Sequence, residues 1–481
     1  MPSESSARMM NPGRFPCGRV AATPGTRREF LQRVGAGFGS LALLDLLQAD
    51  GQPAPGASLP AVRGLHHPAR AKSVIWLFME GGPSAMDTFD PKPELERHHG
   101  QRPSQGIDVF FGSPGPLMKS PFGFHRHGES GRWVCDRMPH IARHVDDLAL
   151  IKSCWVESPS HGPAMYQMNT GVIRAGLPSA GAWVTYGLGT ANRNLPGFVV
   201  LQNSRGSKGG AGNWGSGFLP GDFQATALRA QGSPILNLAR PRGVDADRQR
   251  RLLECARDLN EAHAALHPAE DALRARIQSY ELAFAMQTEA TEAVDFAREP
   301  ASIRREYGLE NPVTRPYGEK CLLARRLVER GVRFVQVYCD DEWDSHDNLR
   351  DGHGRRMDET DQPVAALLGD LKRRGLLEET LVIWGGEFGR MPVSQSGQGR
   401  DHNPQGFCVW MAGGGIRGGA SHGETDEIGW KASVDPVSVH DLHATILHCL
   451  GIQHDRLTYL NNGRQFRLTD VSGELIRSVL A

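Results

Sequence analysis

The chain has 481 residues, a length within reach of one large α/β domain with insertions. Its 54 Lys and Arg residues balance its 54 Asp and Glu residues, so the formal net charge is zero. Because there is no basic excess and no run of Lys or Arg interleaved with aromatic residues, nucleic acid is not an expected partner.

An N-terminal signal segment is predicted over residues 1–50, followed by a linker over residues 51–70. Residues 26–31, Thr-Arg-Arg-Glu-Phe-Leu, form a twin-arginine pattern. The apolar stretch Val34–Leu47 is interrupted by glycines and Asp45, so it is too short and broken to span a bilayer. An ordinary amphipathic helix is the alternative. We expect export by the twin-arginine (Tat) route to the periplasm or the extracellular space, and a mature chain without a transmembrane segment.

The rest of the chain, residues 71–481, alternates short apolar runs with helical patterns, which is typical of βα units. The apolar runs are continuous, as in strands covered on both faces. The predicted strands are Ser73–Met79, Leu148–Lys152, Phe198–Leu201, Val332–Tyr338, Leu381–Trp384 and Phe407–Met411. The clearest helical patterns are Gly318–Arg330, Arg356–Arg374 and Val439–Leu450. This pattern predicts an α/β fold with a mostly parallel central sheet and helices on both faces.

Residues 245–300 are charged and helical in pattern, and no strand is predicted among them. We expect a helical excursion from the sheet that covers the site or packs on a partner. The eight cysteines are scattered and form no Cys-x-x-Cys pair. A full disulfide framework is therefore not expected, although one bridge is left open.

Polar clusters follow the predicted strands. In chain order they span residues 80–87, 158–161, 344–346, 385–387 and 400–403. Loops at the carboxyl ends of parallel strands converge on one crevice, so we expect these side chains to meet. Carboxylates and imidazoles together suit Zn, Mn, Fe, Ca or Mg. A single Asp or His in a loop is more often solvated or caps a helix, so the inference depends on the joint placement.

Two later segments resemble sulfatases. Residues 379–389, Glu-Thr-Leu-Val-Ile-Trp-Gly-Gly-Glu-Phe-Gly, are similar to the sulfatase segment Asn-Thr-Leu-Val-Ile-Phe-Thr-Ser-Asp-x-Gly. Residues 437–452 are similar to the sulfatase run Val-Ser-x-x-Asp-Leu-x-x-Thr-Leu-Leu-x-x-x-Gly-Ile. More closely, Gly81–Lys92, Trp343–His346 and the leader resemble an uncharacterised bacterial family of unknown function, distantly related to sulfatases. The resemblance implies an alkaline-phosphatase-like fold for nearly the whole chain beyond the leader.

The resemblance also implies metal-dependent hydrolysis of a phosphate or sulfate ester, with a small molecule or a glycan as substrate. It assigns one divalent metal (Zn, Mn, Ca or Mg) to Asp344, His346 and His402, and a second metal to Glu387 with Asp87 or Glu80. Glu387 and Phe388 stand where the superfamily usually has Asp and then His or Asn. The second site is therefore short of a ligand.

The nucleophile position departs from the sulfatase pattern, which is Cys or Ser, then x-Pro-Ser-Arg, four residues and Thr-Gly. Residues 161–171, His-Gly-Pro-Ala-Met-Tyr-Gln-Met-Asn-Thr-Gly, keep the Pro and the Thr-Gly but place His161 at the nucleophile and Met165 at the Arg. Formylglycine chemistry needs that Cys or Ser, so an orthodox sulfatase is not expected. His161 is left as nucleophile, general base, metal ligand or relic. Arg390 is the predicted contact of the anionic ester.

An exported ester hydrolase is therefore the leading hypothesis. The alternative is a non-catalytic binding protein of the same fold that has lost its nucleophile. A redox enzyme is suggested by the leader alone, and no Cys-x-x-Cys, haem motif or dinucleotide fingerprint supports it. The histidines of the predicted helix 439–450 have only Asp441 as a nearby carboxylate, and we expect Asp441 to cap or pack.

Overall fold

The structure, a computed structural model, describes residues 65–481 apart from 104–105, 111, 193, 204–205, 230–242, 267–270 and 340–341. The described residues belong to one unit, Ala61–Ala481. The predicted signal segment and most of the predicted linker lie outside the described residues, so both remain predictions.

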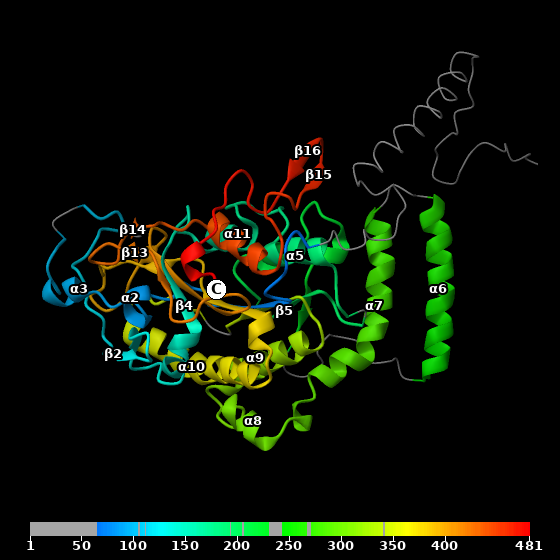
Figure 1. The fold of residues 1–481 in the computed structure, drawn as a ribbon, viewed down its shortest axis with the longest axis horizontal. Coiled ribbons are helices and arrows are strands. Elements are labelled where there is room, and N and C mark those ends of the chain that lie inside the picture. Colours follow the sequence, from blue (N-terminus) through cyan, green and yellow to red (C-terminus); the bar gives the residue numbers. More distant parts are fainter. Residues whose placement is uncertain are drawn as a thin grey trace, which may run out of the picture. The chain divides into compact units, whose positions relative to one another are not determined.

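An eight-stranded sheet forms the centre of the fold (Figure 1). Its spatial order is β12 (Ser421–His422), β4 (Leu148–Cys154), β11 (Phe407–Gly413), β8 (Thr380–Gly385), β1 (Ser73–Phe78), β7 (Phe334–Tyr338), β5 (Phe198–Leu201) and β6 (Thr226–Leu228). Neighbouring strands run parallel except at β11, which is antiparallel to both β4 and β8. The prediction of a mostly parallel sheet is confirmed, and all six predicted strands belong to it.

Helices cover both faces of this sheet because each central strand has apolar side chains on both sides. In β1, Ile75 and Leu77 belong to the core that contains α9 (Arg315–Glu329) and α10 (Leu349–Arg373). On the opposite face, α4 (His161–Thr170), α5 (Ala180–Leu188) and α11 (Val439–Cys449) pack over alternate residues of the same strand. Every residue of β1 is buried, as the continuous apolar run predicts.

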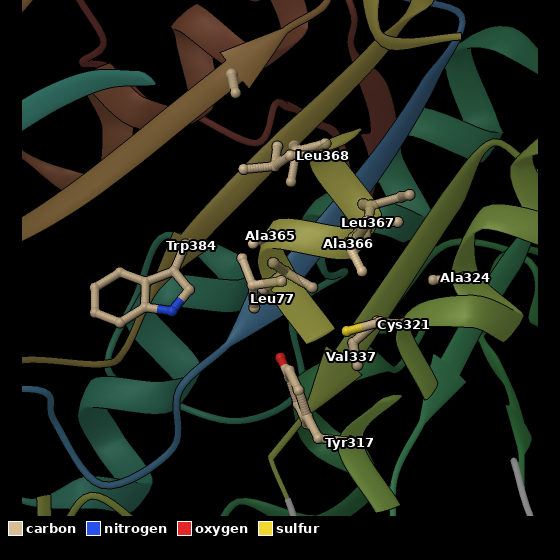
Figure 2. Packing of buried hydrophobic residues seen from close by; sticks show 14 of the residues in the cluster. Leu77, Tyr317, Cys321, Ala324, Val337, Ala365, Ala366, Leu367, Leu368 and Trp384 are labelled. Atoms are coloured by element: carbon tan, nitrogen blue, oxygen red, sulfur yellow. The ribbon is translucent and has the colours of Figure 1, made fainter. Parts of the chain in front are cut away.

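Helices α9 and α10 pack on the sheet and fix the positions of β1, β7 and β8, and the site lies at the carboxyl ends of these strands. Figure 2 shows Ala365–Leu368 of α10 beside Leu77 and Trp384, and Cys321 of α9 beside Val337. Burying such aliphatic side chains stabilises the fold by about 1.5–3 kcal/mol each. The helices therefore hold the ends of β1, β7 and β8 in a rigid arrangement.

The remaining elements are shorter or lie outside the sheet. The predicted helical excursion forms α6 (Ala246–Leu266) and α7 (Asp271–Ala293), which lie side by side in Figure 1. Further helices are α2 (Ala85–Thr88), α3 (Pro93–Arg97) and α8 (Ala301–Glu306). Four two-stranded ribbons are β2 (Phe124–His127) with β3 (Arg132–Cys135), β9 (Gly389–Arg390) with β10 (His402–Asn403), β13 (Glu424–Thr425) with β14 (Ala432–Val434), and β15 (Tyr459–Asn461) with β16 (Arg464–Phe466).

The structure also tests the predictions for Asp441 and for the cysteines. Asp441 completes a capping box with Ser438 at the start of α11, so the prediction that it caps is confirmed. In the part of the chain that the structure describes, the seven cysteines are all free, and all but Cys255 are buried. No helix among these residues is long and apolar enough to cross a bilayer.

Candidate functional site

The candidate site lies where the adjacent parallel strands β1, β7 and β8 end. Gly81 and Gly82 follow β1, Asp344 and His346 follow β7, and Glu387 follows β8. His161 begins α4 and His402 begins β10, which brings two imidazoles to the same place. The predicted convergence of loops from distant parts of the chain is therefore present.

Asp344 is the centre of the cluster. Its Oδ1 lies 2.9 Å from His346 Nε2 and 3.2 Å from His402 Nε2. These two Nε2 atoms are 2.9 Å apart. The other carboxylate oxygen, Oδ2, lies 3.0 Å from His161 Nε2. One carboxylate thus contacts three imidazoles.

Glu387 holds the opposite side of the His161 ring. Its Oε1 is 2.5 Å from His161 Nδ1, and the backbone N–H of Gly81 donates to both carboxylate oxygens at 3.0 and 3.1 Å. Gly81 has φ +106°, and a Cβ there would lie 2.5 Å from the backbone nitrogen of Trp343. Only glycine fits this turn, so the turn brings a backbone donor to Glu387.

The charges of the cluster reinforce one another. Burial disfavours ionisation of Asp344, but hydrogen bonds from His161, His346 and His402 outweigh burial and hold its pKa well below the usual range. Burial likewise opposes charging of His161, but its bonds to Asp344 and Glu387 raise its pKa to about 9. Burial lowers the pKa of His402 despite its contact with Asp344. At neutral pH these side chains alone form an imidazolium between two carboxylates, beside a neutral imidazole.

His402 is fixed in the tautomer that a metal ligand needs. Its Nδ1 lies 2.6 Å from the carbonyl oxygen of Pro159, so Nδ1 donates the proton and Nε2 offers a lone pair. Asp401 accepts a hydrogen bond from the His402 backbone at 2.8 Å and lies 3.7 Å from His346 Nδ1. Two groups of side chains could each hold a metal ion: His161 with Asp344 and His402, and His346 with Asp401 and His402. Within each group the ligand atoms all lie within 4.8 Å of one another.

Arg390 has a different role from the predicted substrate contact. Its side chain is fully buried and donates to the carbonyls of Gly81, Gly82 and Arg400. Its Nη2 also lies 2.7 Å from Asp344 Oδ1. Because its donors are used inside the protein, Arg390 orients Asp344 and joins three loops. The sequence could not show this, since burial of the guanidinium is a tertiary property.

Asp87, predicted as a second metal ligand, also has other partners. Its buried carboxylate lies 2.7 Å from Arg400 Nε and accepts a hydrogen bond from Ser84 Oγ. Burial raises the pKa of Asp87, but the charge and hydrogen bonds of Arg400 outweigh burial and lower it overall. Neither set of candidate ligand atoms found among the described residues includes Asp87 or Glu387. The structure therefore places Asp87 in a buried ion pair.

Glu80 and Lys208 complete the polar wall of the site. Glu80 is buried, and this burial raises its pKa to about 7. A hydrogen bond from the backbone N–H of Lys208 offsets part of the increase, and the negative charge of Glu387 adds to it. Lys208 Nζ lies 2.6 Å from Glu342 Oε2 and 3.2 Å from Asp344 Oδ2, and its side chain is 30% exposed. Sequence reasoning missed Lys208, although its place in a loop after β5 was a usable signal.

His353, also missed, positions the loop that contains Asp344 and His346. The backbone N–H of Ser84 donates to His353 Nε2 at 3.1 Å, and His353 Nδ1 lies 3.0 Å from Ser345 Oγ. Burial lowers the pKa of His353 to about 3, so the ring is neutral and Nδ1 donates. A buried histidine of α10 thus connects the loops after β1 and β7.

A pocket of about 620 Å³ opens beside Asp344 and His346. Its polar wall includes Glu80, Glu342, Arg355 and Arg356. At another side of the site, the ring of Phe110 stacks on His402 with 5.7 Å between centroids and 20° between planes. Space for a polar ligand therefore adjoins the cluster of carboxylates and imidazoles.

Comparison with known proteins gives one family and several distant structures. A family profile described as "Protein of unknown function (DUF1501)" matches residues 71–480. No curated protein matches the chain. Similar solved structures include the PsFucS1 sulfatase from Pseudoalteromonas sp. (12% identity, 80% of this chain and 68% of that chain, TM-score 0.33) and the alkaline phosphatase from the Antarctic bacterium TAB5 (13%, 76% and 96%, 0.30). The phosphonate monoester hydrolase SpPMH from Silicibacter pomeroyi is also similar (15%, 65% and 68%, 0.28).

Proposed function

Since this chain belongs to the DUF1501 family of proteins of unknown function, we propose from its own site that it is an exported, metal-dependent hydrolase of phosphate or sulfate esters. Membership of the family confirms the resemblance found in the motifs. One observation supports the proposed activity most directly: Asp344 contacts His161, His346 and His402, which come from three separate segments of the chain.

The donor set fits a divalent metal. Ligands of one ion lie about 2 Å from it and hence about 3 Å from each other, which is the spacing of Asp344 Oδ1 and the two facing Nε2 atoms. His402 presents its lone pair at this point because Pro159 accepts its other ring proton. The two imidazoles favour Zn over Ca or Mg, and the carboxylate also suits Mn. Asp344, His346 and His402 would hold the ion, and Asp401 lies next to His346 Nδ1 and the backbone of His402.

A bound divalent ion would polarise the ester oxygens and stabilise charge on the leaving group. The remaining steps belong to side chains of the chain. Glu387, anchored by Gly81, accepts a hydrogen bond from His161 Nδ1 and so orients the ring. With the cation bound to Asp344, that carboxylate would no longer favour a proton on His161 Nε2. The free Nε2 would then either attack the phosphorus or sulfur atom and expel the leaving alcohol, or take a proton from the water molecule that does so. Lys208 pairs with the ester anion at the rim.

The substrate side of the proposal depends on the pocket beside Asp344. A polar cavity of about 620 Å³ suits a small-molecule ester or one unit of a glycan ester. Arg355 and Arg356 provide cationic groups on its wall. Export rests on the twin-arginine pattern at residues 26–31 alone.

The test is metal analysis of the purified full chain, followed by assays on aryl phosphates, phosphodiesters and sulfates with and without chelator. We expect stoichiometric metal and chelator-sensitive turnover. Asp344→Asn should remove both, whereas His161→Asn should remove turnover and keep the metal bound by His346 and His402. A folded, metal-free protein without turnover on any of these esters would falsify the proposal.

A non-catalytic binding protein is the second candidate, and one contact favours it. Both ring nitrogens of His161 are engaged by carboxylates, Nδ1 by Glu387 and Nε2 by Asp344, as in a purely structural ion pair. The His161→Asn variant separates the two candidates. If the native chain hydrolyses an ester and His161→Asn abolishes the hydrolysis, the protein is an enzyme. If the native chain shows no turnover and His161→Asn binds the ligand as the native chain does, it is a binding protein.

A further inference from the structure

Helix α6 carries a row of exposed leucines that the proposed hydrolase does not use. Leu252, Leu259 and Leu266 are 57%, 68% and 77% exposed, and none of the residues of α6 is buried. They are seven residues apart, which places them on one side of the helix. Large aliphatic side chains aligned along one exposed side of a helix are typical of a contact surface.

This leucine row is separate from the side of α6 that contacts α7. Leu253, Asn260 and Ala264 of α6 are half-buried, and we infer that they lie on the side of the helix that contacts α7. Leu253 and Asn260 each follow a leucine of the row by one residue, which turns them about 100° around the helix. Figure 1 shows α7 along one side of α6 only. Within the part of the chain that the structure describes, the leucine row is therefore open to another molecule.

The charges of α6 indicate what that molecule is. Residues 246–253 contain three arginines and one aspartate, whereas residues 254–266 contain three acidic residues and one arginine. Two copies of α6 that run antiparallel place the basic half of one beside the acidic half of the other. Two parallel copies place like charges together, which is unfavourable.

We propose that α6 pairs with α6 of a second copy of this chain, antiparallel, about a twofold axis at Cys255. In this register Leu252 packs against the partner subunit's Leu259, and Arg251 lies beside the partner's Asp258. Within α6, Arg250 pairs with Asp247, and Arg257 lies 3.8 Å from Asp258 and 3.9 Å from Glu261. Arg250 and Arg257 lie on the side opposite the leucine row, and Asp258 is shared between Arg257 and the partner's Arg251 in the pair. Cys255 is exposed and meets the same residue of the second copy.

Charge reversal tests the antiparallel register. Arg251→Asp and Asp258→Arg should each raise the dimer dissociation constant about tenfold, because each change places like charges together at two symmetric positions. The double variant Arg251→Asp/Asp258→Arg should restore dimerisation, a result that misfolding cannot imitate. Arg250→Asp, on the opposite side, is the matched control. The readout is sedimentation of the full chain over a range of concentrations.

Cross-linking tests the position of the axis. In a Cys17→Ser background, a short bismaleimide should join two chains through Cys255, and Leu252→Glu/Leu259→Glu should abolish this product. A chain that stays monomeric at tens of micromolar would overturn the proposal. So would a dimer that the leucine variants leave intact, or a monomer that binds anionic lipid vesicles through the same leucines.

Discussion

His346 and His402 hold their Nε2 atoms 2.9 Å apart, beside the same carboxylate oxygen of Asp344. Two imidazole nitrogens at this distance share one proton at most, and the bond from His402 to Pro159 leaves Nε2 of His402 without one. A cation between the two nitrogens satisfies both lone pairs. The pair is therefore the feature from which metal binding is most directly predicted.

Metal binding should stabilise the folded chain. Adding Zn²⁺ or Mn²⁺ to chelator-treated protein should raise the free energy of unfolding by about 2.7 kcal/mol at a metal concentration of 100 Kd. His346→Ala and His402→Ala should each remove this increase, because each deletes one nitrogen of the facing pair. Thermal unfolding with and without metal measures the effect. His98→Ala, at an exposed position, is the control, and an equal metal response in all variants would contradict the assignment.

Lys208 should bind the anionic part of the substrate. Lys208→Met should raise KM for an ester by about ten- to a hundredfold with a smaller change in kcat, because removing a charge-assisted hydrogen bond costs about 1.5–3 kcal/mol. Lys208→Arg should recover part of the loss. Lys72→Met, which breaks an exposed pair with Glu379, is the matched control for steady-state kinetics. An unchanged KM in Lys208→Met would show that this ammonium only neutralises Glu342 and Asp344.

The buried pair of Asp87 and Arg400 should be structural. Asp87→Asn leaves the Arg400 guanidinium buried without its counter-charge, and we expect a loss of about 3–5 kcal/mol in the free energy of unfolding. Breaking the exposed pair of Arg137 and Asp358 with Asp358→Asn should cost under about 1 kcal/mol. Denaturant titration compares the two variants. Equal, small losses would mean that Asp87 is replaceable and free for another role.

His443 should make stability depend on pH. Its ring is buried in α11, where burial lowers its pKa to about 3, and it bonds the carbonyl of Met168. Between about pH 6.5 and 3 the unfolded chain binds a proton at this residue that the folded chain does not. The free energy of unfolding should therefore fall as the pH drops through this window.

His443→Gln keeps a donor for Met168 and removes the titration, so the decline in stability should become shallower by up to about 1.4 kcal/mol per pH unit. Denaturation midpoints between pH 7 and pH 4 give the slope. His98→Gln is the matched histidine substitution at the surface. A slope that His443→Gln does not change would mean that other buried groups dominate the acid response.

Much of the fold could be predicted from apolar runs, and the reasons for the exceptions are physical. The two strands of the central sheet that were missed, β6 and β12, have only three and two residues, too few for a recognisable pattern. The antiparallel direction of β11 was also missed. A fully buried strand shows the same apolar run in either direction, so its orientation is set by the connections around it.

The site was predicted only in part, because some of its residues have roles that depend on tertiary packing. Asp344, His346, Glu387 and His402 follow strands and resemble known motifs, and the structure brings them together with His161. The roles of Arg390 and Asp87 depend on burial and on partners far away in the chain. Neither property can be read from local sequence.

The guanidinium of Arg390 joins segments near residues 81, 344 and 400, which meet only after the sheet between them has assembled. Contacts of such long sequence separation form late in folding. A nascent or half-folded chain therefore has no cluster with which to capture a cation. If the chain leaves the cytoplasm already folded, it can take up its ion there before export, and the metal then available in the cytoplasm decides which ion it takes.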